Sequence, residues 1–282
     1  MIDLHSHTNA SDGTLSPTQL IALAQQQKLE ALAITDHDTF EGYDAALPLA
    51  QAAGLDLVCG IEVSTRFRAK SVHLLGYFLN GNPSEDFRTW LLLLQESRRE
   101  RNKEMVVKLN AMGIGIKLAE VEMLGRSITG RPHFARAMVQ QGYCKTTEEA
   151  FKTYLGEGAR AYVERREIML PDAIALVRES GGIPVLAHPI RLGKEDRAVE
   201  EKWISEIADA GLLGLEVFHS DHAPADVERY QRYTRKLQLA PTGGSDYHGD
   251  NKPDIQLGEG RKKNLNIPFT VLQNLRDSFP NQ

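Results

Sequence analysis

The sequence contains few cysteines and no long apolar run, and these two absences exclude several classes of protein. The 282-residue chain has two cysteines, Cys59 and Cys144, which lie 85 positions apart. An isolated pair of this kind does not build a disulfide framework or a thiolate metal site, so we expect both thiols in the core. No stretch approaches the roughly 20 apolar residues that a membrane-spanning helix needs, so we expect no contact with a membrane.

Two further absences concern targeting and chemistry. The N-terminus, Met1-Ile2-Asp3, has no basic segment followed by an apolar stretch, so we expect no signal peptide and a cytoplasmic protein. The sequence has no Gly-x-Ser-x-Gly motif, and no serine or cysteine stands in a pattern that would give it a histidine base. We therefore expect a reaction without a side-chain nucleophile.

The composition is that of a globular protein with an uneven distribution of charge. Hydrophobic residues make up 41% of the chain and charged residues 25%, which is enough for a full-sized core in one large domain or in one domain with an insertion. The net charge of -5 argues against a nonspecific coat of nucleic acid. Residues 84–166, however, hold 15 Lys and Arg against 11 Asp and Glu, so a basic segment lies inside an acidic chain.

Short apolar runs alternate with helical patterns, which is typical of a parallel sheet built from βα units. Ser16-Pro17-Thr18-Gln19 supplies an N-cap, a proline at the first helical position and a glutamine three residues after the cap, so it predicts a helix over about 17–28. Leu170-Pro171 and Ala223-Pro224 predict two later helices in the same way. The predicted strands lie near residues 2–4, 31–35, 56–63, 72–78, 183–187, 214–218 and 240–243.

The alternation of strands and helices stops between residue 83 and about residue 166. This segment predicts helices joined by glycine-rich turns, including a helix over 96–111 that places Arg99, Asn102 and Val106 on one face. We interpret residues 1–83 and 167–282 as a barrel and residues 84–166 as an inserted helical lid. Because the insertion separates the fourth strand from the fifth, we expect it to emerge at the barrel end that carries the βα loops.

Side chains of metal-ligand type follow the predicted strand ends. Two histidines one residue apart at a strand end, as in His5-Ser6-His7, point to the same face and can hold one metal ion. Barrel enzymes build their sites at the carboxyl ends of the strands, so the set predicts a metal centre there. The candidate ligands are His5, His7, Asp12, His37, Glu62, His73, His188, Asp246 and His248.

The residue types indicate which ions and which chemistry to expect. Neutral imidazoles and carboxylates together suit Mn, Zn or Fe, and a carboxylate such as Glu62 can bridge two ions. Two ions about 3.5–4 Å apart can activate water and clamp both the attacking and the leaving oxygen of a phosphoester. We expect two or three divalent ions, Mn²⁺ in the first place and Zn²⁺ or Fe²⁺ as alternatives. The catalytic side chain and the general acid stay unassigned.

Four motifs of the chain resemble those of the PHP (polymerase and histidinol phosphatase) family in order and context: His5-x-His7, Thr35-Asp36-His37-Asp38, His188-Pro189 and Gly244-Ser245-Asp246-x-His248. The resemblance covers the barrel portion and implies a distorted (β/α)7 TIM-like barrel, of the α/β class, with a trinuclear metal centre. It also implies three ligand sets: His5, His7, Glu62 and Asp246; then Asp12, His37 and His248; then Glu62 with His73 and His188.

The insertion carries the candidate substrate-binding residues, which are Arg99, Asn102, Lys103, Arg131 and His133. Charge on the exposed face of a helix is common, so Arg99 and Lys103 can equally be solvated surface residues. Arg131 and His133 stand at a predicted helix start after Gly130, where backbone N–H groups and a guanidinium can bind a phosphate together. Metals for one phosphate and a basic lid for another suit a substrate that carries two phosphates.

The barrel together with Arg99-Glu100-Arg101-Asn102 and Gly130-Arg131-Pro132-His133 resembles the 3',5'-nucleoside bisphosphate phosphatases and exoribonucleases of the RNase AM type. The resemblance implies removal of the 3'-phosphate of pAp to leave AMP, and trimming of short 5'-phosphorylated RNA from its 5' end. The implied partners are a small nucleotide with two phosphates and short RNA, with no obligate protein partner.

Three alternatives remain open from the residues. A histidinol phosphatase would need one phosphate site and leave the basic insertion without a role. A PHP module could bind metal without turnover, and amidohydrolase barrels also begin with His-x-His, although the Thr-Asp-His-Asp and Gly-Ser-Asp-x-His elements favour PHP. Glu216 could orient a ligand histidine through an outer hydrogen bond, and His219 and His222 could line the pocket.

Overall fold

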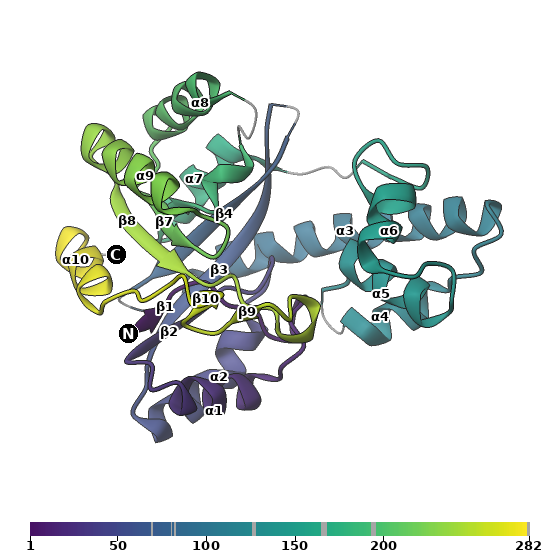
Figure 1. Cartoon of the computed structure of the whole chain (residues 1–282), viewed down its shortest axis with the longest axis horizontal. Helices are drawn as coiled ribbons and strands as arrows, with labels where there is room; N and C mark the ends of the chain where they lie inside the picture. The colour runs from purple at the N-terminus through teal and green to yellow at the C-terminus, as the bar shows by residue number, and fades with distance from the viewer. Residues whose placement is uncertain are drawn as a thin grey trace.

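The structure is a computed structural model that describes residues 1–68, 70–79, 81, 83–125, 128–164, 168–192 and 196–280. A curled sheet with helices around it forms one part of the molecule, and a group of helices projects from it (Figure 1). The predicted boundary at residues 166 and 167 lies outside the described residues.

The sheet contains all seven predicted strands. Their order is β1 (Ile2–Asp3), β2 (Ala31–Ile34), β3 (Asp56–Phe67), β4 (Lys70–Phe78), β6 (Ile183–Leu186), β7 (Gly214–His219) and β8 (Ala240–Gly244). The sheet nearly closes, because Leu4 N donates to Gly243 O at 3.2 Å and Asp246 N donates to His5 O at 2.8 Å. The predicted α/β barrel fold is therefore confirmed.

Three strands were not predicted from the sequence. Strand β5 (Ile168–Met169) pairs with β3, and β9 (Ile255–Gln256) pairs with β10 (Gly260–Arg261) in a separate ribbon. Each has two residues, which is too short for an alternating pattern of apolar and polar side chains to be visible in the sequence.

Strand β4 corrects the expectation of a wholly parallel sheet. It runs antiparallel to β3 and to β6, whereas the other neighbours along the barrel are parallel. The connection explains the direction: Phe67 pairs with Lys70, so β3 and β4 form a tight hairpin. Parallel neighbours need a crossover of a dozen or more residues, and the chain has no room for one here.

The direction of β4 also decides where His73 and the insertion lie. His73 is near the start of β4 and pairs with Ser64, so it lies at the barrel end where the parallel strands finish. The insertion follows the end of β4 and therefore leaves the barrel from the opposite end, so the expected exit point was wrong.

Helix α3 (Glu85–Ala111) brings the insertion back to the site. Its 27 residues give a rod of about 40 Å, and Figure 1 shows it running from the barrel into the projecting helices. Phe87, Leu91 and Leu94 in its first half pack into the apolar core between the sheet and the outer helices. The helix begins at Glu85 rather than at 96, because Ser84 caps it by accepting a hydrogen bond from Phe87 N at 3.2 Å.

Among the described residues, six helices surround the sheet together with the first half of α3. They are α1 (Pro17–Gln26), α2 (Glu41–Ala53), α7 (Leu170–Glu179), α8 (Arg197–Asp209), α9 (Pro224–Leu237) and α10 (Thr270–Ser278). The predicted cap of α1 is present, since Ser16 Oγ accepts from Gln19 N at 3.3 Å and Gln19 Oε1 accepts from Ser16 N at 2.9 Å. Leu32 and Ile34 join one apolar cluster and Ala31 and Ala33 another, so both faces of β2 are buried.

The projecting part contains α4 (Leu118–Gly125), α5 (Arg131–Gln140), α6 (Thr147–Ala150) and the π-helix η1 (Phe151–Leu155). Its buried apolar side chains, among them Met105, Phe134 and Met138, form a third cluster distinct from the two of the barrel. Cys59 and Cys144 are both buried and unpaired with each other, as expected.

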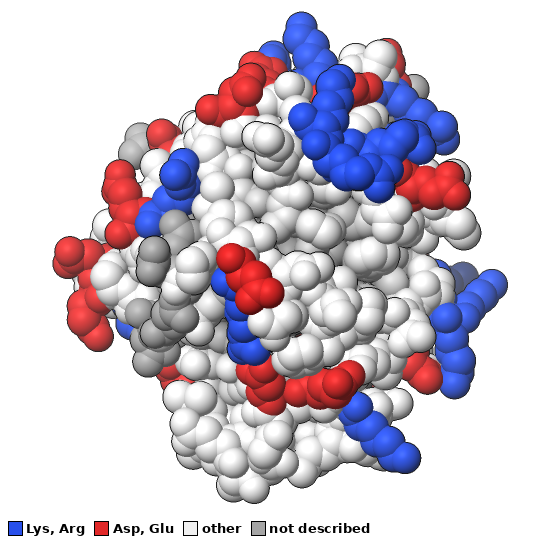
Figure 2. All heavy atoms as spheres, turned by 90° about the vertical axis from the view of Figure 1, so that its left-hand side faces the viewer, with Lys and Arg blue, Asp and Glu red and all other residues white. Residues whose placement is uncertain are grey.

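The face of the molecule turned away from the projecting helices carries charged side chains of both signs (Figure 2). On this face, Lys and Arg gather toward the upper edge and Asp and Glu are scattered among uncharged residues. In the described part of the chain, no helix combines the length and the apolar character needed to cross a bilayer.

Candidate metal centre

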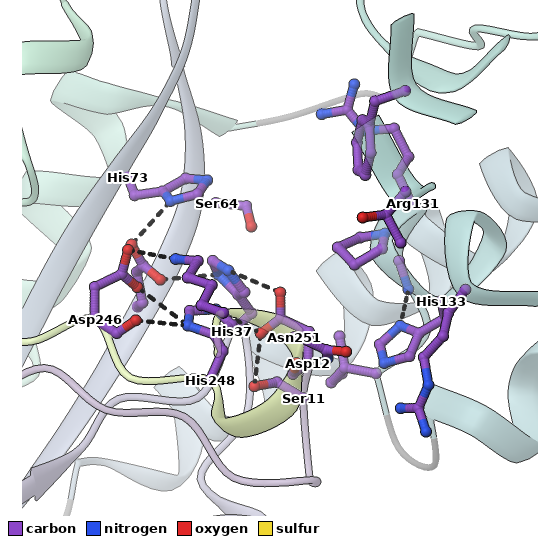
Figure 3. A pocket seen from close by; sticks show the side chains of 18 of the residues that line it. Ser11, Asp12, His37, Ser64, His73, Arg131, His133, Asp246, His248 and Asn251 are labelled. Carbon is purple, nitrogen blue, oxygen red and sulfur yellow. Dashed lines mark hydrogen bonds and ion pairs between the residues drawn. The ribbon is translucent and has the colours of Figure 1, made fainter. Parts of the chain in front are cut away.

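The strand ends and the projecting helices enclose a cavity of about 740 Å³. Figure 3 shows His73, Asp246 and His248 on one side of it and Arg131 and His133 on the other. All nine candidate ligands lie on the barrel side. Six line the cavity, namely Asp12, His37, Glu62, His73, Asp246 and His248, and the other three, His5, His7 and His188, lie buried beneath them.

Glu62 is the centre of the ligand set. Its side chain is 1% exposed, and five imidazoles face its two oxygens. The Oε2 atom lies 3.2–3.4 Å from His5 Nε2, His7 Nε2 and His37 Nδ1, and the Oε1 atom lies 2.8 Å from His73 Nδ1 and 3.1 Å from His188 Nε2. Burial opposes ionisation of this carboxyl, but the surrounding histidines, His73 first among them, together outweigh burial and hold its pKa well below the usual value.

Two aspartates complete the set. Asp246 Oδ1 lies 3.5 Å from His5 Nε2 and from His7 Nε2. Asp12 Oδ1 lies 3.2 Å from His248 Nε2, and its Oδ2 lies 3.8 Å from His37 Nε2.

Among the described residues, four groups have ligand atoms within 4.8 Å of one another and could hold an ion: His5, His7, Glu62 and Asp246; His7, Asp12, His37 and His248; His37, Glu62 and His73; and His5, Glu216 and His219. The first group equals the first set that the resemblance implied, and the second contains the second set with His7 added. The third has His37 in place of His188, which joins none of the groups, and the fourth brings in Glu216 and His219 from outside the implied sets.

Hydrogen bonds fix which nitrogen of three rings is available to a ligand. His5 Nδ1 donates to Glu216 Oε1 at 2.8 Å, and His248 Nδ1 donates to the carbonyl oxygen of Asp246 at 2.8 Å. His7 Nδ1 lies 3.4 Å from Ser11 Oγ, whose hydroxyl donates to Asp36 at 2.6 Å. In a neutral ring with its proton on Nδ1, Nε2 carries a free lone pair.

The chemistry of these donors fits divalent metal ions. Among the described residues, His5 Nε2, His7 Nε2 and His37 Nδ1 are buried and have no hydrogen-bond partner. Desolvated lone pairs of this kind are costly unless something binds them, and imidazoles mixed with carboxylates are the ligands that Zn, Mn and Fe take.

The histidines of the site differ in the direction in which their pKa values are shifted. Burial lowers the pKa of His37 to about 3 and the pKa of His188 well below its usual value, so both rings are neutral, as metal ligands must be. Burial also opposes protonation of His7, but Asp246 and Glu62 outweigh burial and raise its pKa to about 9. A proton and a metal ion would therefore compete for the His7 ring.

Backbone strain collects at the same place. Asp38, His188 and Asp246 have φ angles of 52°, 27° and 57°, in the region that side-chain-bearing residues avoid. Hydrogen bonds hold two of these turns, since Glu216 Oε2 accepts from His188 N at 2.6 Å and Asp38 Oδ1 accepts from Ser64 N at 2.8 Å. Such strain persists where the surrounding structure fixes a functional geometry.

On the lid side, the structure brings two of the five predicted substrate-binding residues to the cavity. Arg131 lines it at the start of α5, with its guanidinium carbon 5.6 Å from the centre of the Tyr162 ring. His133 also lines it, and its Nδ1 accepts from Gly130 N at 3.0 Å. That bond leaves the proton of a neutral ring on Nε2, so His133 is a hydrogen-bond donor there.

The structure does not bring the other three to the cavity. Asn102 is buried beneath it and donates to Thr129 O at 2.8 Å, so it supports the turn before Arg131. Arg99 pairs with Glu122, and Lys103 pairs with Glu100, on the exposed side of α3. Both side chains are about half exposed or more, at 61% and 48%.

Comparison with known proteins agrees with this geometry. The profile of the PHP domain family matches residues 3–164. The chain belongs to the PHP family. A 5'-3' exoribonuclease of Haemophilus influenzae is 34% identical to it over 247 residues, which cover 87% of this chain and 89% of the relative. A 3',5'-nucleoside bisphosphate phosphatase of Chromobacterium violaceum is 32% identical over 262 residues, which cover 91% and 90%.

A solved structure shares the fold over almost the whole chain. It comes from Bifidobacterium adolescentis and is proposed to be a metal-dependent phosphoesterase. Its TM-score is 0.85 at 30% identity, with 98% of this chain and 95% of that chain covered. The predicted family and the predicted fold are confirmed together.

Several cavity residues of this PHP chain were missed by sequence reasoning. Arg191 and Lys252 approach Asp246 Oδ2 at 3.1 Å and 2.6 Å, and Arg136 also lines the cavity. Arg98 and Arg101, which line it too, belong to the basic cluster of the insertion that the sequence had marked. Arg191 follows His188-Pro189 and Lys252 follows His248 within a few residues, so proximity to the motifs was the one signal available.

Carboxylates behind the ligands were also missed, except for Glu216. Asp3 accepts hydrogen bonds from His5 N and Ser245 N, and Asp36 accepts from Thr8 N and the Thr8 hydroxyl. Each carboxylate ties down a loop that carries ligands, and each stands inside a motif that the sequence had already marked.

Replacing Glu216 by glutamine tests the predicted outer hydrogen bond. Glu216 accepts from His5 Nδ1 with one oxygen and from His188 N with the other, and a glutamine amide can accept only on one side. We expect Mn²⁺ affinity to fall by about 10- to 100-fold, measured by titration of the metal-free protein. Glu206→Gln, on the surface beside Arg68, is the control and should bind Mn²⁺ normally. Equal affinity in both variants would contradict the orienting role.

Proposed function

We propose that this PHP enzyme hydrolyses the 3'-phosphate of 3',5'-nucleoside bisphosphates, converting pAp to AMP. One observation carries the proposal: the cavity has a wall of metal-ligand side chains and, opposite it, a wall of arginines from the lid. A substrate with a phosphate at each end matches both walls. In this proposal residues 84–166 form the lid and the nine barrel residues hold the metal ions.

The barrel wall would act on the 3'-phosphate. Divalent ions, which we propose to be Mn²⁺, supply Lewis acidity toward a phosphoryl oxygen and make water more acidic when bound. Glu62 and Asp246 hold the imidazoles around the centre, and Glu216 orients His5. Among the described residues that line the cavity there is no cysteine. Of its three serines, Ser64 and Ser71 hydrogen-bond no histidine, and the Ser11 hydroxyl, 3.4 Å from His7 Nδ1, donates to Asp36.

The lid wall would bind the 5'-phosphate. Arg131, Arg101 and Arg136 supply guanidinium groups, which bind phosphate oxygens with paired N–H groups. His133 adds a neutral N–H donor at the start of α5, where backbone N–H groups and the helix dipole also favour an anion. The ribose would then span the space between the two walls.

A second activity, removal of nucleotides from the 5' end of short RNA, follows from the same geometry. In both reactions the bond broken is on the 3' oxygen of a nucleotide whose 5'-phosphate is held by the lid. The similarity to the exoribonuclease of H. influenzae and to the bisphosphate phosphatase of C. violaceum supports both activities. Histidinol phosphate, with one phosphate, would leave the arginine wall unused.

The experiment is phosphate release by the Mn²⁺-loaded protein from pAp, AMP, histidinol phosphate and 3'-AMP, with a 5'-phosphorylated RNA oligonucleotide run beside them. We expect pAp to be the best substrate, AMP to be spared and the oligonucleotide to be shortened from its 5' end. Rapid turnover of histidinol phosphate without turnover of pAp would overturn the proposed substrate but would be consistent with the proposed metal centre. Inactivity on all of them would favour a binding module.

A further inference from the structure

The lid wall of the cavity is not uniformly basic. Ile128, Pro132 and Phe151 place apolar side chains among its arginines, and Phe151 supplies the one phenyl ring among the described residues that line the cavity. Phosphates gain nothing from such a surface. A flat, apolar part of the substrate would be stabilised by contact with this surface.

The fold holds Phe151 firmly in this position. Phe151 opens the π-helix η1, which Gly156 N closes by donating to Phe151 O at 2.8 Å. Both α6 and η1 pack against α5, the helix that begins with Arg131 and Pro132. The ring is partly buried against the apolar cluster of the lid and partly open to the cavity. Single π-helical turns are rare and occur often at functional sites.

Glu148 lies one helical turn before Phe151 and also lines the cavity. The Glu148 side chain is exposed at the edge of the cavity, where its carboxylate would repel a phosphate and suits a hydrogen-bond donor of the substrate instead. A carboxylate accepts hydrogen bonds and donates none, and an amino group is its natural partner. Thr147, its neighbour, adds a hydroxyl to the same stretch of wall.

We propose that Phe151 and Glu148 form a nucleobase subsite in the lid. The Phe151 ring stacks on the base, and the Glu148 carboxylate accepts a hydrogen bond from an exocyclic amino group, as adenine and cytosine carry. The proposal rests on the proposed function: once both phosphates of the nucleotide are bound at opposite walls, the base is the part left to reach the lid.

Stacking is tested with Phe151→Leu and two substrates. One is pAp, and the other is its abasic analogue, in which hydrogen replaces the base. Leucine preserves the apolar packing of the lid and removes the aromatic face. Stacking of a base on an aromatic side chain is worth about 1–3 kcal/mol, so kcat/KM for pAp should fall roughly tenfold or more while that for the abasic analogue is unchanged.

The hydrogen bond is tested with Glu148→Ala on pAp and on the inosine analogue, whose base lacks the amino group. The variant should lose kcat/KM on pAp and keep it on the inosine substrate. Lys152→Ala is the control, because Lys152 is exposed on the same π-helix and does not line the cavity. Thermal midpoints of all variants show whether the lid remains folded.

The outcomes separate this inference from the proposed function. If the wild-type protein hydrolyses no bisphosphate, the proposed function fails. If the wild-type protein hydrolyses pAp and its abasic analogue with equal kcat/KM, or if Phe151→Leu affects both substrates equally, the function stands and the nucleobase subsite is overturned.

Discussion

Replacing Glu62 by alanine is expected to lower phosphate release from pAp by about a thousandfold or more and to remove bound metal. Five imidazoles converge on this one carboxylate, so no other side chain of the described site is shared by as many candidate ligands. A divalent ion contributes several kcal/mol of charge stabilisation, and about 4 kcal/mol corresponds to a thousandfold in rate. Metal content is measured by mass spectrometry beside the rate.

The control for Glu62 must distinguish loss of metal from loss of fold. Glu206→Ala removes an exposed carboxylate that pairs with Arg68 on the surface, and it should keep both metal and rate. The thermal midpoint of metal-free Glu62→Ala should lie below that of the metal-free wild-type protein, because the low pKa of Glu62 means that its ionised form stabilises the fold. A circular dichroism spectrum that matches the wild type below this midpoint shows that the fold persists at the assay temperature. Full metal content with normal turnover in Glu62→Ala would contradict the proposed centre.

Replacing Arg131 by alanine should abolish the preference for a 5'-phosphorylated substrate. Hydrogen bonds to charged groups contribute roughly 1.5–3 kcal/mol each, so we expect kcat/KM for pAp to fall by about 10- to 100-fold. The rate on 3'-AMP, which has no 5'-phosphate, should be nearly unchanged. The ratio of the two kcat/KM values is the measurement.

Arg99→Ala is the matched comparison for Arg131. Its guanidinium pairs with Glu122 on the exposed side of α3 and does not line the cavity. We expect the variant to keep the wild-type ratio of pAp to 3'-AMP. If Arg99→Ala loses the preference and Arg131→Ala keeps it, the sequence-based choice of helix face is right and the assigned lid wall is wrong.

The positions of the candidate barrel ligands could be predicted because strand ends and short motifs determine them locally. His5 and His7 are two positions apart just after β1, and Asp246 and His248 are two positions apart in the loop after β8. Periodicity and motif spacing locate such residues without knowledge of how strands pair. The antiparallel direction of β4 could have been predicted from the sequence, since the short gap between the third and fourth predicted strands excludes a parallel crossover.

The cavity residues of the insertion were harder to predict, because the rotation of a helix about its own axis decides which of its side chains face the cavity. On α3 the buried residues include Arg101, Asn102 and Met105, whereas the sequence predicted a face with Arg99, Asn102 and Val106, of which Asn102 alone is among the buried residues of the helix. One residue corresponds to about 100° of rotation, so a small error in the choice of face exchanges cavity residues for surface residues. The rotation is set by packing of α3 against the barrel, through contacts such as Leu91 and Leu94, and these involve residues distant in sequence.

The most direct test of the central claim is the identity of the nucleotide that wild-type, Mn²⁺-loaded protein leaves when it hydrolyses pAp. The two-walled cavity assigns the 3'-phosphate to the metal wall and the 5'-phosphate to the arginines. Chromatography of the products should therefore show adenosine 5'-monophosphate and inorganic phosphate in equal amounts. Accumulation of adenosine 3'-monophosphate, or of adenosine with two phosphates released, would contradict the account.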